Sequence, residues 1–400
     1  MSENIAYYEN IIFYKGIFYT KKENLKVTSL HNRIDISYIP TDINLLDNLD
    51  NLDNLDNLDN IEEYDKGIIL IDGFHSNMAH LFWDAMYPSW YGLFYYKDED
   101  ISSNFQWMAT DNMYDQYSDG WHLDIVEKFS GNKITTPKLL SKLYNNPIKI
   151  PYLIVGSKNI GIGCVNSNFT AGRQLKEHIK DPIESFINRI YLKYNIERIN
   201  FLDVKYNKDT SINIIYIINK REYKNIDLLF QELNIKYLNK CNFKIVDWSK
   251  YNFEEQLNIC NSTGIIICGV GTARGNTPFL PNGSIEIQTN IHSLTLPNNI
   301  NYFDYWIGTL SKYIKIININ EYTLYEAQQN LYSQHLKKYI EDSINNFPNE
   351  NIINIEDNIP FDILNLREKC EKEKFTKWRD SMSNSIGDLI LLLNSNNYNN

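Results

Sequence analysis

The chain has 400 residues and a formal net charge of −11, with 43% hydrophobic and 22% charged residues. This length exceeds one small domain and fits two domains or one large α/β unit. The acidic balance argues against a nucleic-acid partner, because no overall positive field would attract phosphates. No run of about 18 apolar residues occurs, so we expect no membrane span.

The amino terminus and the cysteines indicate a cytoplasmic protein. Residues 1–19 lack a charged segment followed by an apolar one, so no secretory signal is predicted. The five cysteines are scattered without a Cys-x-x-Cys pair, which predicts reduced thiols and no structural zinc. Heavy use of Asn, Ile, Lys and Tyr is typical of A/T-rich genomes, including those of many protists, low-GC bacteria and large DNA viruses. For a viral protein the compartment would be the host cytoplasm.

The first element expected in chain order is a buried strand at 67–73, which follows a low-complexity segment. Five Leu-Asp-Asn triplets occupy residues 46–60, and we expect them to form a surface loop. A coil of a solenoid is the alternative, but so few triplets cannot bury a core. Residues 78–96 are aromatic and apolar and are expected to be helical at their start. Residues 148–156 predict a second buried strand.

Helices and strands alternate in the second half of the chain. Asp181 is placed to cap a helix at 183–194, with Pro182 at its first position. The expected strands are 212–218, 243–248, 264–269, 284–287 and 313–319, with helices at 225–238 and 253–261. This alternation predicts βαβ units and a parallel sheet. At least two helices are expected within 326–393.

Three turns are candidate ligand-binding sites, because ligands of open α/β sheets bind at the carboxyl ends of strands. The first is the glycine-rich stretch 269–277, whose small residues would let the backbone approach a ligand closely. If a helix begins near Thr272, its free N–H groups form an anion site, to which Arg274 could add a phosphate contact. The alternative is a plain tight turn, since glycine is the usual turn residue. A dinucleotide fingerprint fits poorly, because the glycines are not spaced Gly-x-Gly-x-x-Gly.

The second turn is Asn219–Arg221, which follows the predicted strand 212–218. An arginine at a strand end beside a cleft is a good phosphate ligand. The alternative is a solvated charge of a kind that is common at strand ends.

The third turn follows the first predicted strand and carries His80 and Asp84. Four residues apart on an α-helix, the two side chains would share one face. A carboxylate can hold an imidazole in one tautomer and raise its basicity, which makes a general base. The alternative is a local hydrogen bond on the surface or in the core.

Several motifs in the same order resemble glycosyltransferase family 61. Residues 77–88 resemble the amino-terminal His/Asp motif of that family, and Asn219–Arg221 resembles its strand-end Asn-Arg. Residues 246–256 are similar to its segment before the glycine turn, and residues 279–287 to its closing strand. The resemblance covers residues 67–290.

Two positions depart from the family pattern. Val270 stands where the family usually has a histidine, and Ala85 stands where the amino-terminal motif has its second aspartate. Either a neighbour such as Arg274 takes over the contact of the missing histidine, or activity or donor choice has changed.

The predicted elements indicate an α/β protein of two halves with a helical carboxyl-terminal tail, and the resemblance implies the GT-B type, with two Rossmann-like domains facing a cleft. The amino-terminal, acceptor-side domain would span 1–185 and the nucleotide-sugar-binding domain 186–325. The tail, 326–400, would pack back on the amino-terminal domain.

The implied reaction is an inverting transfer from a nucleotide-diphosphate sugar, with a UDP-sugar favoured, to a hydroxyl of a glycan or glycoprotein acceptor. The base would be His80 or Asp84. The residues expected to bind the donor are Asn219, Arg221, Gly271, Thr272, Ala273, Arg274 and Asn276. The enzyme would be metal-independent and would use no cofactor beyond the donor itself.

Three alternatives stay open. A degenerate family member would bind glycan or nucleotide without turnover, as the Val270 substitution suggests. An unrelated dinucleotide-dependent enzyme would prefer NADH to UDP. A structural or interaction protein would use the Leu-Asp-Asn repeat. A homodimer is compatible with the sequence, which does not fix the oligomeric state.

Overall fold

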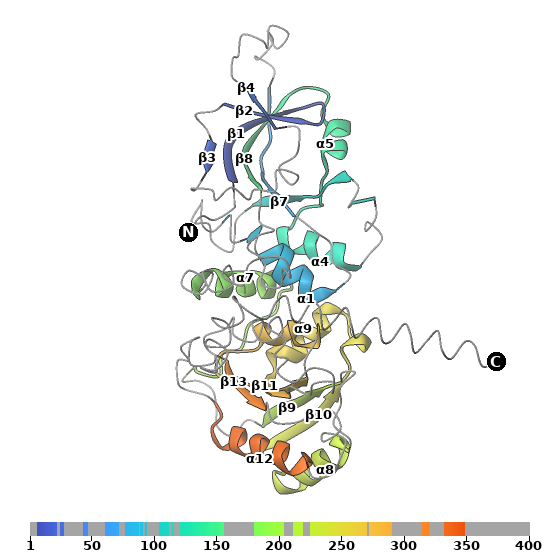
Figure 1. Ribbon diagram of the computed structural model, residues 1–400, viewed down its shortest axis with the longest axis vertical. Helices are drawn as coiled ribbons and strands as arrows, with labels where there is room; N and C mark the ends of the chain where they lie inside the picture. Colours follow the sequence, from blue (N-terminus) through green and yellow to red (C-terminus); the bar gives the residue numbers. More distant parts are fainter. Residues whose placement is uncertain are drawn as a thin grey trace, which may run out of the picture. The chain divides into compact units, whose positions relative to one another are not determined.

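The computed structural model describes two sheets and the helices around them (Figure 1). The described residues are 6–21, 25–27, 43–46, 61–71, 77–87, 89–90, 93, 104–111, 114–115, 121–155, 180–203, 211–218, 225–269, 272–289, 314–319 and 332–348. The chain divides into two compact units, 1–353 and 354–400, and every described residue belongs to the first. Most of the Leu-Asp-Asn segment, and the predicted tail beyond 348, lie outside the described residues. The predicted domain boundaries stay predictions.

The carboxyl-terminal half of the described chain forms a parallel sheet. Its strands are β9 (Ile212–Ile217), β10 (Cys241–Val246), β11 (Thr263–Gly269), β12 (Ile285–Thr289) and β13 (Lys315–Ile319). Their order is β10-β9-β11-β12-β13, and every pairing is parallel. With β9 counted as the first strand, this is the doubly wound order 2-1-3-4-5. The predicted βαβ units and parallel sheet are confirmed.

Both faces of this sheet are covered, which explains its nearly continuous apolar strands. On one face, Ile214 and Tyr216 pack with α8 (Ile226–Lys236) and α12 (Tyr332–Asn345). On the other face, Ile215 and Ile217 join the largest apolar cluster of the described chain. Helix α9 (Phe253–Asn261) begins where the sequence predicted. Its N-cap is Asn252, whose side chain accepts from the Glu255 N–H, while the Glu255 carboxylate accepts from the Asn252 N–H.

The amino-terminal sheet is mixed. Its strands are β1 (Ala6–Tyr14), β2 (Ile17–Lys21), β3 (Leu25–Val27), β4 (Ile43–Leu46), β5 (Glu62–Glu63), β6 (Gly67–Leu70), β7 (Phe105–Met108) and β8 (Ile148–Val155). The order is β4-β2-β1-β8-β6-β7, with β3 beside β1 and β5 beside β8. Strand β6 runs parallel to β7 and β8, as a Rossmann-like unit requires, but β1 runs antiparallel to β2, β3 and β8. The hairpin of β1 and β2, which turns at Lys15 and Gly16 with positive φ at both, was not predicted.

The remaining helical segments lie mainly near the junction of the two sheets. They are α1 (Met78–His80), the π-helical η5 (Leu81–Met86), α4 (Trp121–Ser130), α5 (Pro137–Leu143), α7 (Lys180–Lys193), and the 3-10 segments η7 (Trp248–Lys250) and η8 (Thr272–Phe279). The predicted N-cap at Asp181 is wrong, because α7 already begins at Lys180. Asp181 and Pro182 therefore occupy the first turn, where a proline needs no hydrogen-bonded N–H. Within the described chain, no helix is both long and apolar enough to cross a membrane.

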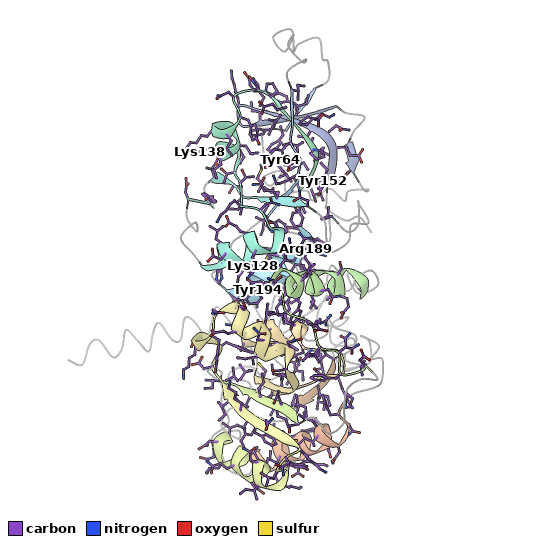
Figure 2. All side chains as sticks on the ribbon, turned by 180° about the vertical axis from the view of Figure 1, so that it is seen from behind. Tyr64, Lys128, Lys138, Tyr152, Arg189 and Tyr194 are labelled. Atoms are coloured by element: carbon purple, nitrogen blue, oxygen red, sulfur yellow. The ribbon has the colours of Figure 1, made fainter. Side chains whose placement is uncertain are left out.

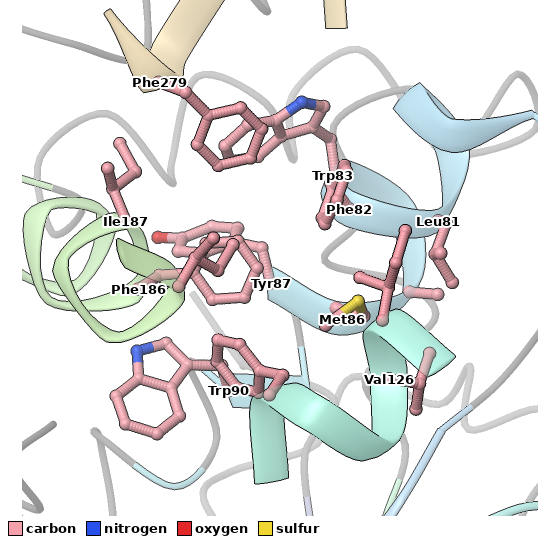
Figure 3. Close-up of a cluster of buried hydrophobic side chains, with 14 of the residues drawn as sticks. Leu81, Phe82, Trp83, Met86, Tyr87, Trp90, Val126, Phe186, Ile187 and Phe279 are labelled. Carbon is pink, nitrogen blue, oxygen red and sulfur yellow. The ribbon is translucent and has the colours of Figure 1, made fainter. Parts of the chain in front are cut away.

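An aromatic cluster joins η5, α7, α9 and η8 (Figure 3). Phe82 and Trp83 of η5 each contact the ring of Phe279, with centroids 5.2 and 5.7 Å apart. Phe186 of α7 lies 5.8 Å from Trp83, and Phe253 of α9 lies 4.9 Å from Phe82. All five side chains are buried, so the core of the described unit runs directly through the predicted His/Asp motif.

Polar contacts reinforce the same junction at its rim (Figure 2). Lys128 of α4 lies over the ring of Tyr194, 4.0 Å from its centroid, and 3.4 Å from the Glu254 carboxylate of α9. Burial raises the pKa of Tyr194, and the nearby Glu254 and Asp124 add to that effect. Arg189 of α7 is fully buried and donates from Nε to a backbone carbonyl of α4.

Candidate functional site

The structure brings together two predicted motifs that are 192 residues apart at their point of contact. The indole Nε1 of Trp83 donates to the carbonyl of Gly275 at 2.9 Å, and both groups are buried. A Cβ at Gly275 would lie 2.6 Å from the Cβ of Ala79 and 3.0 Å from its Cα. Segment η8 therefore packs directly against α1, and the glycine at 275 is required by this close approach.

The His/Asp motif adopts a less regular helix than the sequence predicted. His80 ends α1, and Asp84 lies in the middle of the π-helical η5. A π-helix closes i→i+5 hydrogen bonds, so the predicted α-helical register between the two residues does not hold. Single π-helical turns occur frequently at functional sites. The side chains of His80 and Asp84 lie outside what the structure describes, and their role stays a prediction.

Aromatic donors from three other segments hold the backbone of η8. Besides Trp83, the indole of Trp248 in η7 donates to the Ala273 carbonyl at 3.1 Å. The hydroxyl of Tyr191 in α7 donates to the Phe279 carbonyl at 2.5 Å. Runs of 3-10 helix beyond three or four residues are uncommon, and η8 has eight. We infer that these side chains stabilise the unusual length of η8 and fix the position of its first turn.

Asn276 is bound to the sheet-covering helix α9. Its Nδ2 donates to Gln256 Oε1 at 2.8 Å, and Gln256 in turn donates to the Trp248 and Tyr251 carbonyls. The carbonyl of Asn276 lies 3.8 Å from the Cys260 thiol, whose pKa is raised by burial. The Asn276 side-chain amide therefore holds η8 against α9. Its contact with the donor stays a prediction.

Arg274 lies inside the protein rather than at its surface. Its side chain is 1% exposed, and its Nε donates to Oε1 of Glu286, which is 0% exposed, at 3.1 Å. Burial raises the pKa of Glu286, and the Arg274 guanidinium counteracts this effect. The sequence predicted that the positive charge of Arg274 binds a diphosphate. In the structure, the buried carboxylate of Glu286 in β12 already balances part of that charge. Among the described residues, Nη2 of Arg274 has no hydrogen-bond partner.

Further buried polar side chains surround this ion pair, and those of Thr277 and Gln288 lie close enough to the Glu286 carboxyl to lower its pKa. Among the described residues, no hydrogen bond of good geometry reaches Thr277 Oγ1, Glu286 Oε2, either amide atom of Gln288, or Thr289 Oγ1. Glu286 and Gln288 alternate with apolar residues of β12 that face α8 and α12, so both point to the η8 side of the sheet. A buried polar atom without a partner costs about 1–3 kcal/mol. The proximity of the Thr277 and Gln288 side chains to Glu286 offsets part of that cost. The alternation of polar and apolar residues over 284–289 is the sequence signal for this polar face.

The switch point of the parallel sheet lies between β9 and β11. Strands β9 and β11 are neighbours, with Tyr216 opposite Ile267, so the turns after them lie at the same edge. Asn219, Arg221 and Gly271 belong to these turns and lie outside the described residues. Ligands of doubly wound sheets bind in the crevice at such a switch point.

Thr272 begins η8, and the half-buried Ala273 accepts the bond from Trp248. The side chain of Thr272 is not described. In the described ranges, no group of three or more His, Cys, Asp or Glu residues is arranged to hold a metal ion.

The parallel sheet as far as β12 and its glycine-rich turn lie within a region of the chain that matches a glycosyltransferase family. Residues 121–287 match the family model described as Glycosyltransferase 61, and this region belongs to that family. The predicted resemblance is therefore confirmed from α4 to β12, whereas motif 77–88 lies outside the matched residues. The search of curated proteins gave no match. Among solved structures, the glycotransferase of kitacinnamycin is similar over 70% of this chain and 79% of its own, with 9% identity and a TM-score of 0.19.

Proposed function

We propose that this protein transfers a sugar from a nucleotide-diphosphate donor, most favourably a UDP-sugar, to a hydroxyl of a glycan or glycoprotein, with inversion at the anomeric carbon. The observation that supports the proposal is the packing of Ala79 and Trp83 against Gly275. This packing brings motif 77–88 to the glycine-rich turn, beside the sheet edge where ligands of such folds bind. In this proposal the two sheets are the halves of a GT-B enzyme that works in the cytoplasm.

The proposed reaction is a single displacement. Asp84 or His80 takes the proton of the acceptor hydroxyl, whose oxygen attacks the anomeric carbon from the face opposite the diphosphate. The bond from that carbon to the diphosphate oxygen breaks, and the nucleoside diphosphate leaves with the electron pair. Since the attack and the departure occur on opposite faces, the anomeric configuration inverts.

The departing diphosphate needs positive charge or oriented N–H groups. We assign this task to Arg221 and to the N–H groups of Gly271, Thr272 and Ala273. The first N–H groups of η8 have no partner within the segment, which leaves them available to an anion. Asn219, Asn276 and Nη2 of Arg274 complete the proposed donor site. In this proposal the chain supplies the whole counter-charge, without a metal or other cofactor.

Single substitutions separate the assigned roles. With a UDP-sugar and an acceptor, Asp84→Asn or His80→Ala should lower kcat about 10²–10⁴-fold without changing donor affinity, as expected for loss of a general base. Arg221→Ala should instead weaken donor binding. Asp124→Asn, at an exposed aspartate of α4, is the matched control and should keep full activity. Full rates for both Asp84→Asn and His80→Ala would refute the assignment of the base.

A second candidate is a glycan- or nucleotide-binding protein without turnover. Two observations favour it: Val270 replaces the histidine usual in the family, and Arg274 is paired with buried Glu286. Under this alternative, nucleotide binding persists but no sugar is transferred or hydrolysed. Introducing the family residue by Val270→His would then be the variant to assay for gained activity.

A further inference from the structure

Helix α8 is apolar on two opposite sides. Leu229, Phe230 and Leu233 face the parallel sheet and are buried there. On the outer side, Leu228 is 56% exposed and Ile235 is 80% exposed. Leu238, in the turn after the helix, is 71% exposed. A helix with apolar residues on both sides is typical of one that is buried on both sides in its working state.

The spacing of the exposed residues follows a coiled-coil seam. Leu228, Gln231, Ile235 and Leu238 are separated by three, four and three residues, which are the intervals between a and d positions of heptads. Gln231 is exposed as well, so Leu228, Gln231 and Ile235 form one row on the outside of α8, and the exposed Leu238 follows in the turn just beyond its end. Scattered exposed leucines are normal on a protein surface, but a row at seam spacing indicates a site for another helix.

We propose that this seam docks against α8 of a second copy of the chain, with the two helices antiparallel about a two-fold axis. In that arrangement Leu228 packs against Leu238 of the partner subunit, and Gln231 packs against Ile235 of the partner subunit. A two-fold contact uses the same surface on both copies, so the seam must be complementary to itself. The near-symmetric spacing about residue 233 meets that condition.

Charges at the two ends of the seam select the antiparallel orientation. Asp227 is exposed in the first turn of α8, and Lys240 is exposed just beyond its end. Antiparallel docking brings Asp227 close to Lys240 of the partner subunit at both ends of the contact. Parallel docking would bring like charges together, which is unfavourable.

Two other charges of α8 are already used within the chain. Lys236 donates to Glu341 at 2.7 Å, and Glu232 accepts from Lys337, so both are bound to α12. These two ion pairs attach α8 to α12. Asp227 and Lys240 are therefore the charges that we assign to the seam.

The small size of the seam predicts a weak association. A standard stable interface buries about 800 Å² on each partner, which a row of four side chains on a helix of 11 residues does not reach alone. We therefore expect a dimer whose population depends on concentration, with Kd on the order of micromolar.

Sedimentation velocity on the full chain between about 1 and 200 µM, a range that brackets such a Kd, tests the proposal. The wild type should move from monomer to dimer across the series. Ile235→Lys combined with Leu238→Lys should raise Kd at least about a hundredfold, because each substitution occurs twice in a two-fold contact. Leu143→Lys is the matched control, since Leu143 of α5 is 73% exposed and lies outside the seam, and it should dimerise like the wild type.

A charge exchange tests the orientation. Asp227→Lys should weaken the dimer, because it places a second positive charge close to Lys240 of the partner subunit. Asp227→Lys with Lys240→Asp should restore the wild-type Kd. A wild-type chain that stays monomeric throughout, or a dimer unaffected by Ile235→Lys with Leu238→Lys, would overturn the proposal. A charge exchange without restoration would overturn the antiparallel arrangement.

Discussion

The contact between Ala79 and Gly275 makes a quantitative prediction about the link between the two motifs. A Cβ at position 275 would lie 2.6 Å from Ala79 Cβ and 3.0 Å from Ala79 Cα. The first distance is too short for two carbons, and the second involves backbone that cannot rotate away. Since overpacking a buried contact costs about 1–3 kcal/mol, Gly275→Ala should destabilise the folded chain by that amount.

A double-mutant cycle isolates the contact from the other effects of each substitution. Ala79→Gly alone should cost about 1 kcal/mol through its lower helix propensity. Combined with Gly275→Ala, it removes the 2.6 Å clash, so the double variant should be more stable than the sum of the single costs predicts. The coupling should reach at least about 1 kcal/mol, within the range found for residues in contact.

Urea unfolding of the full chain, followed by circular dichroism, provides the free energies for this cycle. Gly264→Ala is the matched control, because its added Cβ would meet Phe347, 2.8 Å away, rather than Ala79. Its cost should add to that of Ala79→Gly without coupling. If Gly275→Ala and Ala79→Gly are additive within about 0.5 kcal/mol, the two segments do not pack as described and the reasoning fails.

Three further substitutions have expected outcomes that separate the contacts of the site. Trp83→Phe keeps a ring in the core but removes the donor to the Gly275 carbonyl, so thermal unfolding should show a loss of about 1–3 kcal/mol, and an unchanged stability would contradict the anchoring role. Arg274→Met leaves Glu286 buried without its cation, at a cost of about 3–5 kcal/mol. The pKa of folded Glu286 then rises further above its unfolded value of about 4.3, so this variant should lose stability as pH rises above about 4. Arg274→Met with Glu286→Gln should lose that pH dependence; a persisting slope would assign it to another group. Asn252→Ala should destabilise α9 by about 1 kcal/mol in chemical denaturation, and no change would show that the capping box is dispensable.

Local signals predicted the parallel half of the fold well. Helix α9 was predicted at its observed bounds, because a polar residue able to cap a helix, Asn252, stands directly before Phe253 in the sequence itself. The apolar strands β9 and β11 were equally clear, since a parallel sheet covered on both faces needs continuous apolar residues. The first helix of this half, α7, was placed slightly too late, because a proline fits several positions in a first turn.

Long-range packing decided what the sequence did not predict. Strand β1 pairs antiparallel with β8, so that Ile11 lies opposite Ile150, and no short-range pattern encodes a pairing across that distance. The sequence around Arg274 is typical of a phosphate ligand. Only the packing of β12 reveals that Arg274 Nε donates to the buried carboxylate of Glu286. The π-helical turn at Leu81–Met86 was not predicted either, and the motif carries no separate signal for it.

Nucleotide binding tests the central claim of the account most directly. A thermal-shift series with UDP, GDP, dTDP, CMP and NADH, each with and without EDTA, compares the candidate ligands on the wild-type chain. The account predicts a shift with one nucleoside diphosphate, most favourably UDP, that EDTA does not change. At a hundred times its Kd such a ligand stabilises the folded chain by about 2.7 kcal/mol, which is easily measured. No shift with any nucleotide, or a larger shift with NADH than with UDP, would contradict a nucleotide-sugar site at the glycine-rich turn.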